Sequence, residues 1–530
     1  MSFKLTYATM FDPPESLHAD FEAALQRVRA GLGATHGLHL GGQDPMRPAT
    51  QRLVSPIDTR LHLGDFAVAG RDDVTLAVQQ ARQAFPAWRR TPVAERTALM
   101  RRVADLMEQR VYELAAALAL EVGKNRMEAL GEAQETVDFF RQYAHDFEAA
   151  QGFDVPLPDD PLPGVKSTNR SILRPYGVWG VIAPFNYPLA LMGGPTAAAL
   201  VTGNVVVAKG SPHTPWAGRL LADCLRDAGL PPGVFQLLNG PNDTVAEPLA
   251  AHPAIAGLTF TGSVAVGRRL LAQSVAGPWP RPCIAEMGGK NPCIVTDRAR
   301  LDDAATGIVR SAFGLSGQKC SALSRVYVHE AVAEALIERL RAGIAALRIG
   351  DPTERVHWMG PVNNAEAVAR FERCVAGLKA GGATLLAGGG RLRDGAQAHG
   401  HYVQPTLAEA PADHPLWRQE MFLPLLMLQR VRSRDEAMQR ANDTDLGLTA
   451  GFYGGDDEVA WFHEHIEAGV TYANRAQGAT TGAWPGYQPF GGWKGSGSTG
   501  KAIASFHYLP LYLREQSRTV VLPGPGAAGA

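Results

Sequence analysis

Four short apolar segments constrain the fold of this chain more strongly than any other feature. They span residues 178–182, 205–208, 234–238 and 257–260, and helical stretches alternate with them, such as the one expected over 215–228. Short apolar strands that alternate with helices are typical of a parallel, doubly wound sheet. We therefore predict an α/β fold built around such a sheet.

A second alternating region follows residue 286. Apolar segments at 293–295 and 325–328 precede a helix that is expected over 331–347. The chain has 530 residues, which is too many for a single hydrophobic core. We therefore predict a second α/β domain.

Charge and composition exclude several classes of protein. The net charge of −1 implies no general attraction to nucleic acid or to an anionic membrane. No apolar run is long enough to span a bilayer, and the first five residues lack the pattern of a signal peptide. The five cysteines are odd in number, and their spacing suits neither a zinc site nor a disulfide framework. We therefore expect a cytoplasmic protein without a bound metal.

Candidate ligand-binding residues lie where the strands of the first sheet end. Ligands of parallel sheets bind beyond the carboxyl ends of the strands, where Asn186, Lys209 and Gly262 fall. Asn186 could stabilise an oxyanion and Lys209 could reach a ribose or phosphate, although a turn residue and a surface lysine are the commoner roles. Gly262 and Gly267 bracket a turn that could bind a phosphate or be purely structural, and their spacing departs from Gly-x-Gly-x-x-Gly.

Cys320 is the candidate nucleophile. It lies among small and polar residues beside Lys319, where a thiolate is favoured, whereas a structural cysteine usually has apolar neighbours. A lone cysteine is still a weak indication. Glu286 precedes Gly288 and Gly289, so its carboxylate could lie close to a ligand or in an exposed turn.

The helix expected over 126–147 carries three glutamates, Glu128, Glu132 and Glu135. A charge run on a helix usually faces water. We therefore interpret Glu128 and Glu132 as a solvated acidic face.

Together these motifs resemble the aldehyde dehydrogenase superfamily from about residue 50 to residue 520. The candidate cysteine and glutamate are 320 − 286 = 34 positions apart, as the resemblance requires. The matching motifs are, in chain order, Pro184-Phe185-Asn186-Tyr187-Pro188, Lys209-Gly210-Ser211, Phe260-Thr261-Gly262-Ser263 with Gly267, Glu286-Met287-Gly288-Gly289-Lys290-Asn291-Pro292, Gly317-Gln318-Lys319-Cys320, Glu420-Met421-Phe422-Leu423-Pro424, Asn442-Asp443-Thr444 with Gly447-Leu448-Thr449, and Pro489-Phe490-Gly491-Gly492-Trp493-Lys494-Gly495-Ser496-Gly497.

The resemblance implies an aldehyde dehydrogenase-like fold in three parts. A Rossmann-type cofactor domain would cover residues 1–153 and 176–286, and an α/β catalytic domain residues 287–485. A small oligomerisation sheet would combine 155–175 with 499–521, and 523–530 would form a disordered tail. The apolar run 508–513 would be covered by a partner subunit, which implies a homodimer or a larger homo-oligomer.

The resemblance also implies a mechanism. Cys320 would attack the aldehyde, and the Asn186 amide together with the Cys320 backbone N–H would stabilise the oxyanion of the thiohemiacetal. Hydride would pass to NAD, and Glu286 would activate the water that hydrolyses the resulting thioester. The residues implied for cofactor binding are Lys209, Ser211, Gly262, Ser263, Gly267, Glu420 and Phe422.

Two positions depart from the pattern of the superfamily. Pro212 stands where many members have a glutamate that binds the ribose 2′-hydroxyl, so NADP stays possible beside NAD. Leu423 replaces the usual glycine after Phe422, and the sequence offers no physical reason for this change.

Within the superfamily the chain is most similar to the 1-pyrroline-5-carboxylate dehydrogenases, which oxidise glutamate γ-semialdehyde to glutamate in proline catabolism. The residues that carry this similarity are Glu121-Val122-Gly123-Lys124-Asn125, Gly317 to Ala322 with Ser324-Arg325, and Thr481-Gly482-Ala483. The similarity implies that the backbone N–H groups of Gly482 and Ala483 and the Ser321 hydroxyl bind the substrate carboxylate. It also implies that Phe185 and Phe490 enclose the aliphatic part and that Glu135 lies near the amino group.

Two other functions stay open at this point. Gly-Gln-Lys-Cys also occurs in relatives that oxidise succinate or α-ketoglutarate semialdehyde or aliphatic aldehydes, and Trp484-Pro485-Gly486-Tyr487 is bulky for a carboxylate-binding loop. A non-catalytic structural protein on the same fold is a further alternative. The simultaneous presence of Asn186, Glu286 and Cys320 argues against it, because a scaffold has no need of all three.

Overall fold

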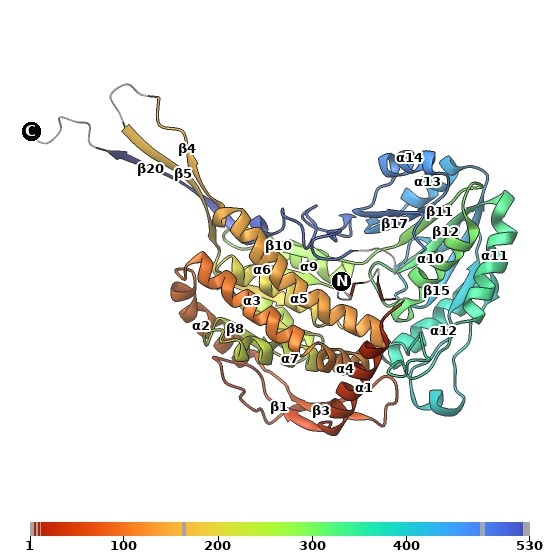
Figure 1. The fold of residues 1–530 in the computed structure, drawn as a ribbon, viewed down its shortest axis with the longest axis horizontal. Helices are drawn as coiled ribbons and strands as arrows, with labels where there is room; N and C mark the ends of the chain where they lie inside the picture. Colours follow the sequence, from red (N-terminus) through yellow and green to blue (C-terminus); the bar gives the residue numbers. More distant parts are fainter. Residues whose placement is uncertain (1–4, 7–8, 11, 162–165, 477–482, 523–530) are drawn as a thin grey trace, which may run out of the picture.

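Two largely parallel sheets organise the computed structural model, which describes residues 5–6, 9–10, 12–161, 166–476 and 483–522 (Figure 1). The first sheet has the strand order β10-β9-β6-β7-β8, and all its neighbouring strands are parallel. Its strands are β6 (Val178–Ile182), β7 (Val205–Lys209), β8 (Phe235–Leu238), β9 (Ile255–Thr261) and β10 (Cys283–Glu286). The predicted doubly wound sheet is thus confirmed, and the carboxyl ends of its strands share one edge.

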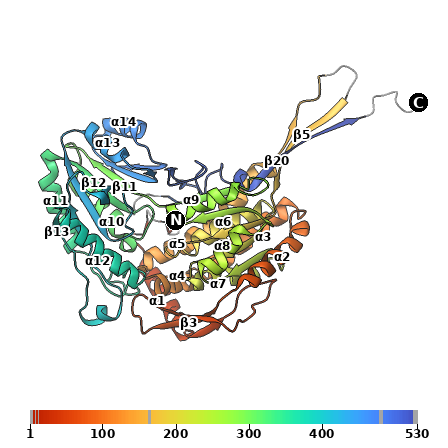
Figure 2. The ribbon, with the colours of Figure 1, turned by 180° about the vertical axis from the view of Figure 1, so that it is seen from behind.

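Helices cover both faces of this sheet because its strands are apolar on both sides. Helix α2 (Arg71–Trp88) packs on β6, β7 and β8, and α6 (Ala190–Val201) on β6 and β7. Helix α5 (Arg126–Ala149) packs on α6 and on its neighbours α3 (Val93–Gln109) and α4 (Val111–Val122). Figures 1 and 2 show α5 within this helical layer, and its start contacts the second half of the molecule through Asn125 and Glu128.

The second sheet has the strand order β13-β14-β15-β12-β11-β17-β18, and only β13 runs antiparallel to its neighbour. Alternate residues of each strand face opposite sides, so Val326 and Val328 pack under α10 and α11 while Tyr327 packs under α12. The elements are β11 (Asn291–Val295), β12 (Leu323–His329), β13 (Thr384–Ala387), β14 (Thr406–Glu409), β15 (Leu425–Val431), β17 (Thr449–Tyr453), β18 (Val470–Ala473), α10 (Leu301–Phe313), α11 (Glu330–Ala345), α12 (Ala365–Ala380), α13 (Arg434–Asn442) and α14 (Val459–His465).

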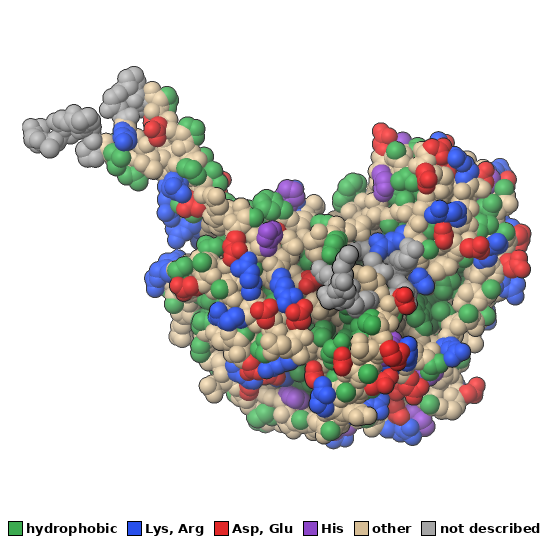
Figure 3. Space-filling model, in the orientation of Figure 1, with side chains coloured by type: hydrophobic (Ala, Val, Ile, Leu, Met, Phe, Trp, Pro, Cys, Tyr) green, Lys and Arg blue, Asp and Glu red, His purple; other side chains and the backbone are tan. Residues whose placement is uncertain are grey.

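A third sheet forms an arm that projects from the body of the molecule (Figure 1). It pairs β4 (Asp154–Leu157), β5 (Lys166–Pro175) and β20 (Leu513–Leu522) antiparallel, and its register runs from Leu513 opposite Pro175 to Leu522 opposite Lys166. Figure 3 shows hydrophobic side chains along this arm. The large apolar side chains exposed there are Val155, Leu157, Val520, Val521 and Leu522.

The prediction that a partner subunit covers the apolar run 508–513 is wrong. Tyr508, Leu509 and Tyr512 are 0% exposed within their own chain, where they join the core of the first half. The Tyr512 hydroxyl lies 2.9 Å from Oγ1 of Thr259 and donates to the Tyr508 hydroxyl at 3.0 Å. Apolarity of a segment does not reveal what covers it, and here the cover is the chain itself.

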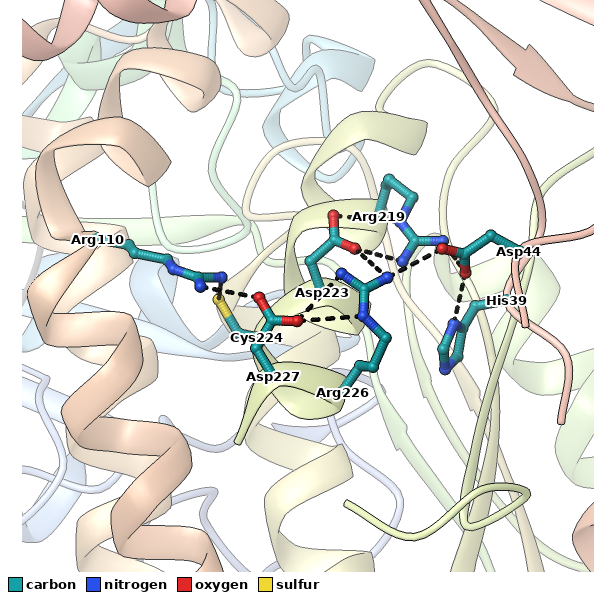
Figure 4. A network of polar contacts seen from close by, with 8 residues as sticks. All are labelled: His39, Asp44, Arg110, Arg219, Asp223, Cys224, Arg226 and Asp227. Carbon is teal, nitrogen blue, oxygen red and sulfur yellow. Dashed lines mark hydrogen bonds and ion pairs between the residues drawn. The ribbon is translucent and has the colours of Figure 1, made fainter. Parts of the chain in front are cut away.

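A network of ion pairs fastens helix α7 (Pro215–Asp227) to neighbouring segments (Figure 4). Arg219 lies at its centre, 2.7 Å from Asp44 in the N-terminal region and 2.6 Å from Asp223 on the same helix. The other members are His39, Arg110, Cys224, Arg226 and Asp227.

The remaining elements are short or peripheral. They are α1 (Glu15–Ala30), β1 (Ala34–His36), β2 (Thr50–Val54), β3 (His62–Ala67), α8 (Glu247–Ala251), α9 (Val264–Val275), β16 (Leu446–Gly447) and β19 (Trp493–Lys494). All five cysteines are free thiols. Within the described ranges, no helix is both long enough and apolar enough to cross a membrane.

Candidate active site

A cavity of about 460 Å³ opens at the carboxyl edge of the first sheet and is closed by residues of the second half. This size is typical of a pocket for a small molecule or cofactor. Nine residues singled out from the sequence line it, namely Phe185, Asn186, Lys209, Ser211, Gly262, Ser263, Cys320, Glu420 and Phe422. Residues from distant parts of the chain therefore meet at the place that the strand topology indicates.

The turn before Cys320 has an unusual backbone. Leu315, Ser316 and Gly317 all have positive φ angles, of 47°, 53° and 68°. Only glycine fits at position 317, because a Cβ atom there would lie 2.1 Å from the carbonyl oxygen of Leu423. Two successive non-glycine residues in the left-handed region store strain, which typically marks a functional site.

The thiol of Cys320 lies in an environment that opposes its ionisation. Burial, together with the negative charges of Glu420 and Glu286, raises the pKa of Cys320 to about 12. Lys319 does not counter this effect, because its Nζ lies 2.6 Å from Oε1 of Glu128 in a buried ion pair. The prediction that Lys319 favours a thiolate is therefore wrong, since the adjacent cation already has a partner on α5.

Asn186 and Asn291 hold the cysteine loop from two sides. Asn186 is 3% exposed, and its Nδ2 donates to the carbonyl oxygen of Gln318 at 2.9 Å. Asn291 donates to the carbonyl oxygens of Cys320 at 2.7 Å and Ala322 at 2.8 Å. Asn291 stands in one of the matching motifs without a predicted role, and the signal in the sequence for close backbone packing is the pair of glycines before Lys290-Asn291.

Glu286 ends β10 as a buried carboxyl group that is 6% exposed. Its Oε2 atom has no hydrogen-bond partner among the described residues. Burial raises the pKa of Glu286 well above its usual range. Buried polar atoms are normally paired, so an unpaired acceptor beside the cavity suits a group that receives a proton from a transient partner.

One side of the cavity has the features of an anion-binding cradle. Ser263 caps α9, its Oγ accepting from the backbone N–H of Val266 at 3.4 Å, so the start of this helix faces the cavity. Gly267 lets α9 pack closely, because a Cβ atom there would lie 2.4 Å from the sulfur of Met287. Lys209 is 1% exposed, its Nζ lies 2.5 Å from Oδ1 of Asn242, and burial lowers its pKa to about 8.

Glu420 and Phe422 close the cavity from the second half. Oε1 of Glu420 accepts from the backbone N–H of Gly289 at 3.1 Å, and burial raises the pKa of Glu420 to about 7. Phe422 has a φ of 57° and meets Phe185 edge to face, with ring centroids 5.9 Å apart. Leu423 is 4% exposed in the core of the second half, and the left-handed residue is Phe422, so the backbone needs no glycine at position 423.

Of the described residues predicted for substrate binding, Phe185 lines this cavity. Phe185 lies in the cavity wall, with Phe422 and His213 as ring neighbours. Phe490 is partly buried at the edge of the first core and is not part of that wall, and Gly482 lies outside the described residues. The backbone oxygen of Ser321 accepts from Thr449 Oγ1 at 3.3 Å, while Ala483 is buried and Glu135 is partly buried on α5.

Trp484 packs in the core of the first half and is not part of the cavity wall. It is 2% exposed, and its Nε1 donates to Oδ2 of Asp138 on α5 at 2.7 Å. Tyr487 is 65% exposed. The large side chain of Trp484 therefore fits in the core, and that of Tyr487 lies in solvent.

The interpretation of Glu128 and Glu132 as a solvated face is wrong. They are 3% and 0% exposed, and each is paired with a buried lysine. The first turns of α5 are covered by loops of both halves, so residues 128–133 are all buried. Helical periodicity alone cannot reveal this cover.

Comparison with known proteins identifies this architecture. The model of the aldehyde dehydrogenase family matches residues 45–515. The chain belongs to the aldehyde dehydrogenase family. This aldehyde dehydrogenase is therefore an oxidoreductase, and its predicted fold class and family resemblance are confirmed.

Relatives that are named for their activity are similar over nearly the whole chain. A 1-pyrroline-5-carboxylate dehydrogenase of Geobacillus thermodenitrificans is 35% identical over 508 residues, which cover 94% of this chain and 95% of the relative. One of Bacillus cytotoxicus is 34% identical over 508 residues, 95% of this chain and 96% of that relative. A solved structure of the Thermus enzyme of the same name with bound NAD superimposes with a TM-score of 0.91 at 32% identity, covering 98% and 99% of the two chains.

Proposed function

We propose that this aldehyde dehydrogenase oxidises L-glutamate γ-semialdehyde, formed from 1-pyrroline-5-carboxylate, to L-glutamate in proline catabolism. The observation that carries the proposal is that Cys320 and Asn186 line one cavity and that Glu286, directly before the lining residue Met287, acts electrostatically on Cys320. The relatives of this chain bear the name of this activity over nearly their whole length. The anchor sequence Thr481-Gly482-Ala483 and the Ser321 hydroxyl are our candidates for the carboxylate end of the substrate.

The cavity fits a nicotinamide dinucleotide, and the similar Thermus structure contains NAD. The start of α9 with Gly262 and Ser263 suits a pyrophosphate, Lys209 and Ser211 suit the adenosine ribose, and Glu420 suits the second ribose. Arg370 also lines the cavity, and its buried Nε has no hydrogen-bond partner in the described part of the chain. When bound, NAD accepts the hydride of the reaction.

Pro212 leaves room for NADP as an alternative cofactor. A carboxylate at this position would repel a 2′-phosphate, and none is present. Glu247, which lines the same cavity, lies 3.0 Å from Arg269 in an ion pair that offsets its charge.

The side chains support a division of labour in the reaction. Cys320 gives its proton to a water molecule and its sulfur bonds to the aldehyde carbon, while the Asn186 amide and the Cys320 backbone N–H stabilise the oxyanion. After hydride has left the same carbon, Glu286 takes a proton from water, whose oxygen attacks the thioester carbon and expels the thiolate. Each donor to an oxyanion is typically worth about 3 kcal/mol of activation barrier.

The proposal extends to organisation, assembly and location. We assign residues 1–153 and 176–286 to the cofactor domain, 287–485 to the catalytic domain, and 155–175 with 499–521 to a segment that joins subunits into a homodimer or larger assembly. The exposed apolar side chains of the arm support the last assignment. Five free thiols support a reducing cytoplasm.

The decisive assay follows reduction of NAD and NADP by absorbance at about 340 nm with three substrates. These are pyrroline-5-carboxylate, succinate semialdehyde and a simple aliphatic aldehyde. We expect the highest kcat/KM for pyrroline-5-carboxylate with NAD. We also expect the variant Cys320→Ser to lose turnover with every substrate. Preference for another aldehyde would transfer the substrate assignment to that compound, and full turnover of Cys320→Ser would contradict the catalytic assignment.

A further inference from the structure

Two carboxylates of α5 lie under the loops that carry Cys320 and Asn186. Glu128 and Glu132 are buried, and their spacing of four residues places them on one face of the helix. We propose that both are positioning residues, which hold the nucleophile and the oxyanion donor at a fixed distance from each other through one rigid helix. The proposal rests on the catalytic roles proposed above for Cys320 and Asn186.

Glu128 binds the nucleophile loop at two points. Its Oε2 accepts a hydrogen bond from the backbone N–H of Leu315 at 3.1 Å, and its Oε1 lies 2.6 Å from Nζ of Lys319. Leu315 begins the left-handed turn and Lys319 directly precedes Cys320. The carboxylate therefore holds the strained backbone on both sides of its bend.

The position of Glu128 is itself fixed by the start of α5. Asn125 caps this helix, and its Oδ1 accepts from the backbone N–H of Glu128 at 2.9 Å. The Nδ2 of Asn125 donates to Oε2 of Glu128 at 3.1 Å and to the carbonyl oxygen of Trp358 at 2.8 Å. Asn125 thus orients the Glu128 carboxylate independently of its contacts with the Cys320 loop.

Glu132 binds the other loop of the site, the one that carries Asn186. Its Oε1 accepts from the backbone N–H groups of Leu189 at 2.8 Å and Ala190 at 3.2 Å, where α6 begins directly after the Asn186 loop. Its Oε2 is paired with Lys124, whose Nζ lies 3.4 Å from the centre of the Tyr187 ring. A carboxylate at the start of a helix is electrostatically favourable, and here it orients the residues next to Asn186.

Charged groups suit this task better than apolar contacts. Hydrogen bonds to ionised groups are short and directional, and a buried carboxylate whose partner is removed is strongly disfavoured. Lys319 is then the counterion of Glu128 and not an activator of the thiol. The charges that act on the Cys320 thiol are the carboxylates of Glu286 and Glu420, while Lys319 and Glu128 cancel each other.

Alkylation of Cys320 by iodoacetamide tests this assignment without any substrate, so its result is independent of which aldehyde the enzyme oxidises. In Glu128→Gln the Lys319 cation has no counterion, so it should favour the Cys320 thiolate and speed alkylation at pH 8 at least threefold. In the same variant kcat should fall at least tenfold, because the Cys320 loop loses its hydrogen bonds to α5. In Lys319→Gln the uncompensated carboxylate should slow alkylation at least threefold.

The double variant Glu128→Gln/Lys319→Gln separates a counterion from an activator. If the two charges cancel, its alkylation profile between pH 7 and pH 10 returns to within twofold of the wild type. If Lys319 activates the thiol, the double variant alkylates as slowly as Lys319→Gln, and the proposal is overturned. Wild-type kcat and alkylation in Glu128→Gln would overturn it as well.

Glu132→Gln completes the test, because Glu132 contacts the other loop. We expect at least a tenfold loss of kcat with an alkylation rate within twofold of the wild type.

Glu148→Gln is the matched control, since Glu148 lies on the same helix in a surface ion pair with Arg101. Its kcat and alkylation should both stay within twofold of the wild type. Melting curves of all variants identify any that fail to fold, and equal kcat losses in Glu132→Gln and Glu148→Gln would overturn the positional argument.

Discussion

The Cys320 thiol is protonated at neutral pH, because its pKa is raised to about 12 by burial and by two carboxylates. Only the thiolate reacts with an alkylating agent. Below the pKa, the thiolate fraction increases about tenfold for each pH unit. We therefore expect the alkylation rate of the cofactor-free enzyme to rise steeply and without a plateau between pH 7 and pH 10.

Iodoacetamide modification followed by mass spectrometry of the Cys320 peptide measures this profile. Cys320→Ala corrects for the other four thiols, all of which are buried. A plateau below pH 9 would show that the site stabilises the thiolate even without a ligand.

Glu286→Gln should separate the two halves of the reaction. The carboxyl is proposed to act only after hydride transfer, and loss of a general base typically lowers the rate about 10²–10⁴-fold. We expect a rapid burst of about one NADH per active site, followed by a steady state at least 100-fold slower than in the wild type. Rapid mixing with absorbance detection measures both phases. Loss of the burst itself would assign Glu286 to the first half of the reaction.

The sequence allows the reacting residues to be predicted more readily than their supports. Cys320 and Glu286 stand in motifs whose residue types already suggest chemistry. Glu128 looks like a surface residue, because helical periodicity shows which residues share a face but not what packs on that face. Lys319 is adjacent to Cys320 in the chain, yet its side chain is directed to α5.

The turn before the nucleophile is the element whose geometry tolerates least change. Gly317→Ala would place a Cβ atom 2.1 Å from the Leu423 carbonyl oxygen at a φ of 68°. Left-handed backbone in a non-glycine residue costs roughly 1–3 kcal/mol, and the contact adds to this cost. We expect a loss of stability of at least ~2 kcal/mol and at least a tenfold loss of kcat.

Gly229→Ala is the matched control for this substitution. Gly229 has a φ of 87°, but no atom lies within 4 Å of a Cβ placed there. The control therefore has the backbone strain without the collision, and we expect a loss of only ~1 kcal/mol with unchanged kcat. Urea unfolding midpoints compare the two, and equal losses would show that the collision has no effect.

The start of α7 has a buried carboxyl cap. Glu121 accepts from the backbone N–H groups of Trp216 at 2.7 Å and Ala217 at 3.0 Å, and burial raises its pKa to about 8. A pKa that is higher in the folded state than in the unfolded state makes folding less favourable as pH rises. The stability that the protonated Glu121 carboxyl contributes is fully present below about pH 4.5 and is lost as pH rises through about 8.

We therefore expect the unfolding midpoint of the wild type to fall, relative to Glu121→Gln, between pH 5 and pH 8. Urea titrations at pH 5, 6.5 and 8 measure the difference, since glutamine does not ionise. A constant difference between the two proteins over this range would contradict the raised pKa.

The two parallel sheets could be predicted because buried parallel strands are short apolar runs. The helix expected over 126–147 matches α5 at its start and falls two residues short of its end at Ala149. Strands β5 and β20 could not be found in this way. Both have water on their faces and contain mostly polar or charged residues, so they carry no apolar pattern, and only the family resemblance placed a sheet there.

At the scale of the whole molecule, the arm is the candidate surface for assembly. Val520 and Val521 are 57% and 63% exposed on β20. Lysines at both positions add charge to an apolar surface and disturb no contact of the core, so we expect a smaller assembly with unchanged secondary structure. Light scattering coupled to size-exclusion chromatography measures the mass. Thr519→Lys, an exposed polar position on the same strand, is the control, and an unchanged mass in the double variant would place the interface elsewhere.

The route of the chain from the arm into the core has a thermodynamic consequence. Strand β20 follows directly on Tyr512, whose hydroxyl contacts Thr259 on β9, two residues before the end of that strand at the cavity. If subunits associate through the arm and thereby order this segment, association and ligand binding share a coupling free energy, which acts equally in both directions. Bound dinucleotide then strengthens the assembly, and dilution weakens dinucleotide binding. The specific activity of such an enzyme depends on its own concentration.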